Sequence, residues 1–287
     1  MLPAMTRKPR IAIVGTGRLG TALAIQLKRA GYSISELISR DGSVSKIQKQ
    51  LASRVRVRLV VPAEAHLSAE VIWFCVPDRK ISAAARDLLR AVEWKGKVAF
   101  HSSGALSSEE LLDLRKRGAK VASVHPMMTF VHGTVPSLHA VPFALEGDAA
   151  ATRLAARIVA DLGGFSLKIS VRNKAAYHAW GAFASPLVIA LLATAEQVAG
   201  AAGIQAIEAR KHMLPILRQT LENYARSGPK GAFSGPLVRG DAEVVRKHLS
   251  VLRKVPGAAE VYLALARSAL RHIPVQERAN LKRILTR

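Results

Sequence analysis

The chain has 287 residues, a length typical of two domains, and its apolar share of 49% suffices for a sizeable core. A single cysteine, Cys75, excludes an intramolecular disulfide framework and a cysteine metal cluster, and we expect no metal site. Residues 1–165 carry 24 basic and 13 acidic side chains and residues 166–287 carry 19 and 7, so the formal net charge of +23 is spread along the chain. A nucleic-acid-binding surface usually clusters its cations, so we expect no nucleic-acid partner.

The chain has no expected membrane segment. No apolar run reaches the ~20 residues that a membrane-spanning helix needs. The first ten residues are basic and lead directly into a strand-like run, without the apolar stretch and cleavage site of a signal peptide. The sequence therefore predicts a cytoplasmic protein that does not enter a membrane.

Short apolar runs alternate with helical patterns in the first half. A glycine turn after the first run leads into a helix over 18–30, which Gly31 ends. Ser107 and Glu110 have the spacing of a capping box, and Gly118 ends the helix expected after them. This alternation predicts a parallel, doubly wound sheet. Strands are expected at 10–14, 34–39, 57–60, 71–76, 97–101 and 120–124, with candidate extensions at 141–145 and 165–169.

The composition changes after about residue 170, where no convincing strand pattern follows. Pro186 is expected to kink the first helix of this part, and breaker-rich stretches at 228–231 and 234–236 mark a loop. Long helices rich in Ala and Leu need a covered face, which predicts a homodimer. The fold class is therefore α/β: a doubly wound, mostly parallel Rossmann sheet over 1–165, then an all-helical domain over 166–287. The helices of that domain are expected at 172–199, 204–226, 241–253 and 257–271.

A GxGxxG pattern follows the first predicted strand and opens a helix, which is the context that dinucleotide binding requires. In such a loop one glycine permits the tight turn, one lets the backbone approach a pyrophosphate, and one lets the helix lie close to the strand. The helix N-terminus adds free N–H groups. A glycine-rich turn without a ligand is the alternative interpretation. The cofactor-binding residues expected here are Gly15, Thr16, Gly17, Arg18, Leu19 and Gly20.

The second predicted strand ends at Ser39, Arg40 and Asp41, about 20 residues after the glycine loop. An NAD enzyme usually has an acid there for the ribose 2′-hydroxyl, whereas an NADP enzyme has space and an arginine for the 2′-phosphate. Ser39 offers a hydroxyl and Arg40 a guanidinium, which favours NADP. NAD is the alternative, because Asp41 becomes the ribose acid if the strand ends one residue later. A solvated cation is the alternative interpretation of Arg40.

Two further strand ends are expected to face the same crevice, because ligands bind outside the carboxyl ends of parallel strands. At 74–78, Val76 and Pro77 are expected to form an apolar wall beside the cofactor. Cys75, next to them, is more consistent with a small buried hydrophobe than with a nucleophile. At 101–104, the imidazole and the two hydroxyls can bind a substrate carboxylate or the nicotinamide amide, or can form a polar turn instead.

His125 ends a third strand at this edge of the sheet. Imidazole is the side chain best suited to exchange a proton near neutral pH. His125 is therefore a candidate proton donor, with a hydrogen-bonded structural histidine as the alternative.

The motifs together resemble one family of the 6-phosphogluconate dehydrogenase-like superfamily. That family pairs a Rossmann-like domain with a helical C-terminal domain of unknown function, and its members are assigned as oxidoreductases without a substrate. The chain is more distantly similar to pyrroline-5-carboxylate reductase, deazaflavin-dependent NADP reductase and prephenate dehydrogenase. The motifs that carry the resemblance are GTGRLG at 15–20, FCVPD at 74–78, HSSG at 101–104, HPMMTF at 125–130, KAAYH at 174–178 and GPLVRGD at 235–241.

The resemblance implies that Lys174 donates a proton to a carbonyl, because the superfamily often places a lysine early in its first long C-terminal helix. Lys174 and His178 are four residues apart and share a helical face, so they can act as acid and relay. An ordinary surface lysine beside a half-buried histidine is the alternative. Ser185-Pro186 departs from the Ser-Asn of the family pattern. Arg239 can clamp an anionic substrate.

These observations predict an NADP-dependent oxidoreductase that transfers a hydride between nicotinamide and a small carbonyl or imine. An NADP(H)-binding regulatory or scaffold protein without turnover is the alternative. The expected catalytic residues are Lys174, His178 and His125. The residues expected to bind substrate are His101, Ser102, Ser103 and Arg239.

Overall fold

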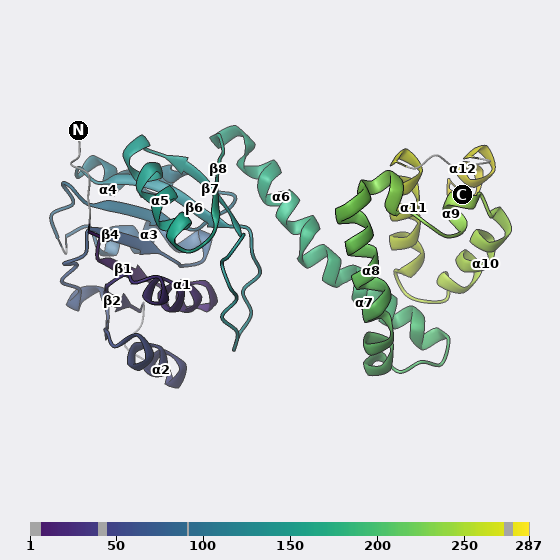
Figure 1. Cartoon of the computed structure of the whole chain (residues 1–287), viewed down its shortest axis with the longest axis horizontal. Coiled ribbons are helices and arrows are strands. Elements are labelled where there is room, and N and C mark those ends of the chain that lie inside the picture. Colours follow the sequence, from purple (N-terminus) through teal and green to yellow (C-terminus); the bar gives the residue numbers. More distant parts are fainter. Residues whose placement is uncertain (1–6, 40–44, 91, 273–277, 287) are drawn as a thin grey trace. The chain divides into compact units, whose positions relative to one another are not determined.

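The computed structural model describes residues 7–39, 45–90, 92–272 and 278–286. The chain divides into two compact units, Met1–Ala182 and Phe183–Arg287, and each is described by itself. In Figure 1 the first unit runs from purple to teal and the second ends in yellow. The division between residues 165 and 166, expected from the change in composition, stays a prediction.

One eight-stranded sheet organises the described part of the first unit, in the order β3-β2-β1-β4-β5-β6-β7-β8 (Figure 1). The first six strands are parallel, β7 is antiparallel to β6, and β8 is parallel to β7. The doubly wound, mostly parallel sheet is confirmed, including both candidate extensions. The strands are β1 (Ile11–Val14), β2 (Ile34–Ile38), β3 (Arg58–Val60), β4 (Val71–Phe74), β5 (Val98–His101), β6 (Lys120–Pro126), β7 (Pro142–Gly147) and β8 (Phe165–Lys168).

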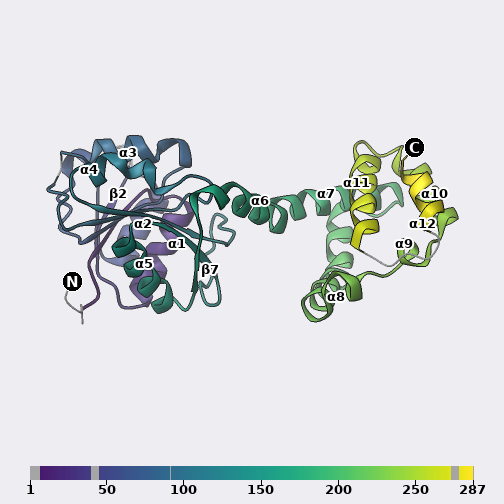
Figure 2. The same ribbon diagram turned by 90° about the horizontal axis from the view of Figure 1, so that it is seen from above.

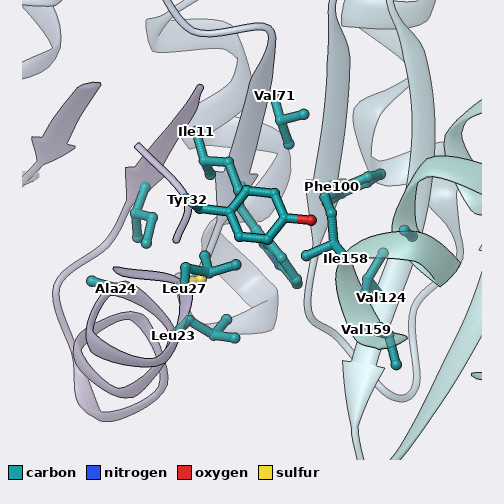
Figure 3. Packing of buried hydrophobic residues seen from close by; sticks show 14 of the residues in the cluster. Ile11, Leu23, Ala24, Leu27, Tyr32, Val71, Phe100, Val124, Ile158 and Val159 are labelled. Atoms are coloured by element: carbon teal, nitrogen blue, oxygen red, sulfur yellow. The ribbon is translucent and has the colours of Figure 1, made fainter. Parts of the chain in front are cut away.

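Helices cover both faces of this sheet (Figure 2). They are α1 (Arg18–Arg29), α2 (Lys46–Val55), α3 (Ile81–Asp87), α4 (Leu112–Lys116) and α5 (Ala149–Asp161). Ile11 and Ile13 of β1 pack in the layer with α1 and α5, whereas Ala12 and Val14 pack in the layer with α3 and α4. Figure 3 shows the first layer, with the Tyr32 ring at its centre. Both faces are covered, so the central strands β1 and β4 are apolar and buried throughout rather than alternating.

The carboxyl edge of the sheet has a step between β5 and β6. β5 ends at His101, which pairs with Ser123 of β6. β6 continues to Pro126, because antiparallel β7 pairs with it as far as Phe143. After β8 and a 3-10 turn, the chain enters α6 (Lys174–Ala184). The polar side chains described below gather at this step.

The second unit is helical in the part that the structure describes, as the sequence predicted. Pro186 starts a new helix, and Ser185 before it has non-helical φ and ψ of −135° and −80°, which confirms the break expected there. Gly228 has φ of 62° and ψ of −175° inside α8, which confirms a break at this point. The loop expected over 228–231 is otherwise wrong, because the residues after Gly228 are helical as far as Ala232. The helices are α7 (Pro186–Ala201), α8 (Ala206–Ala232), α9 (Pro236–Arg239), α10 (Ala242–Leu252), α11 (Ala258–His272) and α12 (Arg278–Leu285).

The stretch Val171–Ala201 is long and apolar enough to cross a membrane by length and composition, with a mean hydropathy of 1.5. The expectation that no apolar stretch reaches this length is therefore wrong. One such stretch is weak evidence for a membrane span. Two of its features are unlike a span: Lys174 near its start is buried against the sheet, and Pro186 interrupts it.

The expected capping box at Ser107 and Glu110 is wrong. Ser107 makes no side-chain cap, and a 3-10 turn follows it. The Glu110 carboxylate instead accepts a hydrogen bond from Ser82 of α3, a tertiary contact that local spacing does not reveal. A capping box is present at Ser45 and Gln48, where α2 begins.

Candidate active site

The glycine turn after β1 packs so closely that two of its three glycines are required by the protein itself. Gly15 has φ of +97°, and a Cβ there would lie 2.6 Å from the Cys75 carbonyl oxygen. A Cβ on Gly20 would lie 1.9 Å from the Gly15 carbonyl oxygen, so only glycine lets α1 approach β1. Gly17 differs, because a Cβ there meets no atom of the described residues within 4 Å. Its bare backbone faces open space.

A cleft of about 800 Å³ opens beside this turn and fits a dinucleotide. Gly17 is the N-cap of α1, and no side chain in the described residues caps that helix, so its first N–H groups remain for a ligand. Arg18, Arg79 and Lys80 line the cleft and suit its phosphates. Leu19 packs on the core instead. The expected cofactor residues that line the cleft are Gly15, Thr16, Gly17, Arg18, Ser39, Cys75, Val76 and Pro77.

The end of β2 forms one wall of this cleft. Ser39 is buried there, with 6% of its surface exposed. Gln48, from the first turn of α2, donates to Thr16 Oγ1 at 2.8 Å and to Ser39 Oγ at 3.0 Å. Arg40 and Asp41, on which the choice between NADP and NAD was expected to depend, lie outside the described residues.

The turn after β4 borders the cleft and also reaches the next strand end. Val76 and Pro77 line the cleft, while Cys75 is buried, and burial raises the pKa of its thiol. Cys75 is therefore a small buried side chain, as the sequence favoured. Ser103 Oγ donates to Asp78 Oδ2 at 2.7 Å. The turn from Cys75 to Asp78 thus joins the cleft to the loop after β5.

The loop after β5 is a polar turn whose groups are already bonded. His101 Nδ1 accepts from the Ser103 N–H at 3.1 Å, and Nε2 lies 2.9 Å from the Ser107 carbonyl oxygen, so Nε2 carries the proton. Burial lowers the pKa of His101 to about 4, which keeps the ring neutral. Ser102 Oγ accepts from Trp73 Nε1 at 2.8 Å. The expected direct contact of His101 with substrate does not fit, because its ring has neither a free nitrogen nor an exposed surface.

Lys174 is buried at the start of α6, with 1% of its surface exposed. Its Nζ donates to Ser123 Oγ at 2.8 Å and lies 3.4 Å from the Ser103 carbonyl oxygen. Ser123 Oγ in turn donates to that carbonyl oxygen at 2.9 Å. Burial lowers the pKa of Lys174, and the carboxylates of Glu146 and Asp78 act in the opposite direction. The ammonium group therefore holds the loop after β5 against β6.

His125 and His178 approach each other across Gly104. A Cβ on Gly104 would lie 2.7 Å from His178 Cδ2 and 2.9 Å from His125 Nε2, so only glycine leaves room for both rings. The His125 Nδ1 atom lies 3.0 Å from the Tyr177 hydroxyl. Burial lowers the pKa of His125 to about 4, and the neighbouring His178 and Lys174 add to this. His178 is exposed, so it is the accessible imidazole of the pair.

The structure brings together most of the expected site residues, but they divide between two adjoining places and the second unit. Arg239 lies at the end of α9 in that unit, exposed, with its Nε 2.9 Å from Asp241 Oδ2. The sequence did not single out several residues that the site uses. These missed residues are Gln48, Asp78, Ser123, Glu146 and Tyr177. Two of them carried a signal in the sequence: Gln48 has the spacing of a capping box, and Tyr177 follows Lys174 in a Lys-x-x-Tyr spacing.

Two family models match the chain. Residues 4–126 match the Rossmann-like domain, and residues 141–269 match the domain of unknown function DUF2520. The chain pairs a Rossmann-like domain with a DUF2520 domain. This pairing confirms the family that the sequence motifs resembled. A comparison with curated proteins finds no match.

Three solved structures are similar over nearly the whole chain, and they share its fold. A Bacteroides fragilis protein assigned as an NADP oxidoreductase is 21% identical, with a TM-score of 0.77 over 91% of this chain and 98% of its own. A Thermotoga maritima protein is 25% identical, with a TM-score of 0.69 over 96% and 99%. The Myxococcus stipitatus imine reductase, solved with NADP⁺, is 17% identical, with a TM-score of 0.67 over 96% and 100%. The chain thus has the fold of NAD(P) oxidoreductases.

Proposed function

We propose that the chain is an NADP-dependent oxidoreductase that transfers a hydride between nicotinamide and a small carbonyl or imine. The observation that carries the proposal is the turn at Pro77 and Asp78. Pro77 lines the dinucleotide cleft, and the next residue bonds Ser103 in the network that contains Lys174. Hydride transfer needs the cofactor site and the proton-handling groups to be neighbours. The fold shared with the M. stipitatus imine reductase, solved with NADP⁺, adds support.

A bound NADPH would supply the hydride. The backbone N–H groups that follow Gly17 hold its phosphates, helped by the cations of Arg18 and Lys80. Val76 and Pro77 exclude water from one side of the cleft. These residues bind and orient the cofactor, and they take no part in proton transfer.

Reduction of a carbonyl or imine also needs a proton beside the developing charge. Lys174 is buried and bonded, so we assign it a positioning role: through Ser123 it fixes the loop that contains Gly104. The imidazoles of His125 and His178 flank that glycine, and His178 is the exposed one. We assign proton donation to His178 and orientation of the substrate to His125. Proton donation by Lys174 itself, which the family resemblance implies, requires its ammonium group to leave this network.

The burial of Lys174 also favours the second candidate function, an NADP(H)-binding regulatory or scaffold protein without turnover. In that protein the Lys174 network would be purely structural. The two functions differ in one measurable respect: both bind NADPH, but only the oxidoreductase consumes it.

The test is the loss of NADPH absorbance with a panel of ketones, aldehydes, keto acids and cyclic imines. With an active substrate, His178→Gln should lower kcat by about 10²–10⁴-fold, the size of a general-acid effect, while the Kd for NADPH stays unchanged. Lys174→Met should lower kcat as well, through the loop that Lys174 positions. Lys116→Met, an exposed lysine at the end of α4, is the matched control. NADPH binding without turnover across the panel would favour the scaffold function. Normal turnover by Lys174→Met would remove Lys174 from the mechanism.

We also propose that the protein is a cytoplasmic homodimer. Support for the dimer comes from apolar side chains that α7 and α8 expose, which in a single chain would meet water. We propose neither a membrane nor a nucleic acid as a partner. Pro186 breaks the apolar stretch, and the positive charge is spread along the sequence.

A further inference from the structure

The side-chain amide of Gln48 lies between two hydroxyls on the wall of the cleft. Its Nε2 donates to Thr16 Oγ1 at 2.8 Å and to Ser39 Oγ at 3.0 Å. Its Oε1 accepts a hydrogen bond from the Ser45 N–H at 2.8 Å. A backbone N–H can only donate, so this third bond fixes which end of the amide is the oxygen. Both Nε2 hydrogens are therefore used on the two hydroxyl oxygens.

This orientation decides what the two hydroxyls can offer a ligand. Each oxygen already accepts a hydrogen from Gln48, so each hydroxyl hydrogen points elsewhere. Thr16 and Ser39 both line the cleft, and neither hydroxyl donates to an acceptor recorded in residues 7–39, 45–90, 92–272 or 278–286. The pair presents two O–H donors, both within hydrogen-bond distance of one nitrogen, to the group that occupies this end of the cleft.

We propose that Gln48 is a specificity-determining residue that makes this end of the cleft select a ribose phosphate ester over a free ribose hydroxyl. The inference rests on the proposed dinucleotide function of the cleft. The oxygens of an ionised phosphate ester can only accept hydrogen bonds, and O–H···O⁻ bonds are among the stronger hydrogen bonds. A ribose hydroxyl instead needs an acceptor for its own hydrogen. The hydroxyls of Thr16 and Ser39 are poor acceptors for it, because Gln48 already occupies a lone pair of each and leaves them as donors. Gln48 therefore selects the cofactor without contacting it.

The substitution Gln48→Glu tests this at constant side-chain length. One carboxylate oxygen still accepts from the Ser45 N–H, so the capping box and the melting temperature should persist. The other oxygen can only accept, so the hydroxyls of Thr16 and Ser39 turn their hydrogens toward it and present lone pairs to the cleft. Isothermal titration should show binding of NADPH and of 2′,5′-ADP weakened about 10- to 100-fold. Binding of NADH and of ADP should change by about threefold or less.

Gln50→Glu is the matched control, because Gln50 lines the same cleft from the same helix and the substitution adds the same charge. It should weaken NADPH binding much less than Gln48→Glu. An equal loss in both variants would mean that charge alone acts, and would overturn the inference. An equal loss of NADPH and NADH in Gln48→Glu would overturn it too, because the hydroxyls would then serve the shared pyrophosphate.

The two proposals can fail separately. A wild-type protein that prefers NADPH through Gln48, yet turns over no substrate, would leave this inference standing and remove the reductase proposal. Turnover with NADPH that is unaffected by Gln48→Glu would do the reverse. A wild-type protein that binds neither dinucleotide nor either nucleotide fragment would overturn both.

Discussion

At the scale of single residues, the three glycines of one motif are present for different physical reasons. Gly17→Ala adds a methyl group only to open space, since φ there is −72° and no described atom lies within 4 Å. We expect an unchanged melting temperature and NADPH binding weakened by about 10- to 100-fold through overlap with the pyrophosphate. Isothermal titration and thermal unfolding measure the two effects.

Two other glycine substitutions serve as controls for Gly17→Ala. Gly20→Ala should destabilise the fold, because its Cβ would lie 1.9 Å from a carbonyl oxygen. Gly181→Ala, in α6, also meets open space and should raise stability by up to ~1 kcal/mol through helix propensity. Unaltered NADPH affinity in Gly17→Ala would contradict the assignment of this turn to the pyrophosphate.

Buried imidazoles should make the stability depend on pH. Burial lowers the pKa of His101 and of His125 to about 4, from an ordinary value of 6.5. Between these values the unfolded chain binds more protons than the native chain, so the free energy of unfolding falls as the pH falls through this window. Each ring should contribute on the order of 1–3 kcal/mol to that fall.

The contribution can be isolated by substitution. His125→Gln retains a partner for the Tyr177 hydroxyl and removes one of the two titrating rings. Denaturant unfolding across the window should then show a shallower dependence on pH, whereas His212→Gln, at an exposed position of α8, should leave it unchanged. If the free energy of unfolding depends on pH equally in wild type and His125→Gln, His125 is not a buried neutral imidazole in the native protein.

At the scale of elements, the loop between β6 and β7 borders the cofactor cleft and is bonded to α1. Residues 131–134 line the cleft, and Gln26 Nε2 donates to the Pro136 carbonyl oxygen at 2.6 Å. Gln26→Leu should loosen this wall and speed NADPH dissociation about 2- to 10-fold, the usual size of one hydrogen bond. Stopped-flow displacement measures the rate. The control is Gln219→Leu on exposed α8, and an unchanged rate in Gln26→Leu would mean that the loop is held by other contacts.

The elements themselves were predictable because local periodicity and global packing agree. The apolar runs, the glycine loop and the break at Pro186 each follow from residues close in sequence. The site was predictable only where a motif marks it. The bond between Ser103 and Asp78, and the burial of Lys174 behind Ser123, join residues far apart in the chain, so spacing carries no signal of them. The expected contact of His101 with substrate does not fit for another reason: both of its ring nitrogens bond groups nearby in the chain, at Ser103 and Ser107, and the residue types alone do not show that a local turn uses them.

At the scale of the whole molecule, the exposed apolar side chains of the helical unit predict a homodimer. The sizes of the exposed fractions decide this: Phe183 is 70% exposed, Ile189 64% and Ile216 67%. Light scattering at micromolar concentration should report twice the chain mass of 30.8 kDa. Each copy carries a formal charge of +23, so added salt should strengthen the association.

A pair of substitutions locates the interface. Ile189→Glu with Ile216→Glu should give a monomer, because burial of two carboxylates costs several kcal/mol. Leu112→Glu, at 36% exposure on α4 of the sheet unit, should leave the mass unchanged. A monomeric wild type would contradict the dimer outright.

The step at the sheet edge sets which kinds of mutation the site can survive. Ser123 and His125 are two apart on β6 and so face the same side, where Lys174 and Tyr177, three apart on α6, meet them one to one. A substitution changes one of these contacts and leaves the others in place. An inserted or deleted residue at position 124 would turn His125 to the opposite face and separate it from Tyr177 in a single event. Divergence at this edge is therefore expected to proceed by replacement, with length variation confined to the loop beyond Pro126.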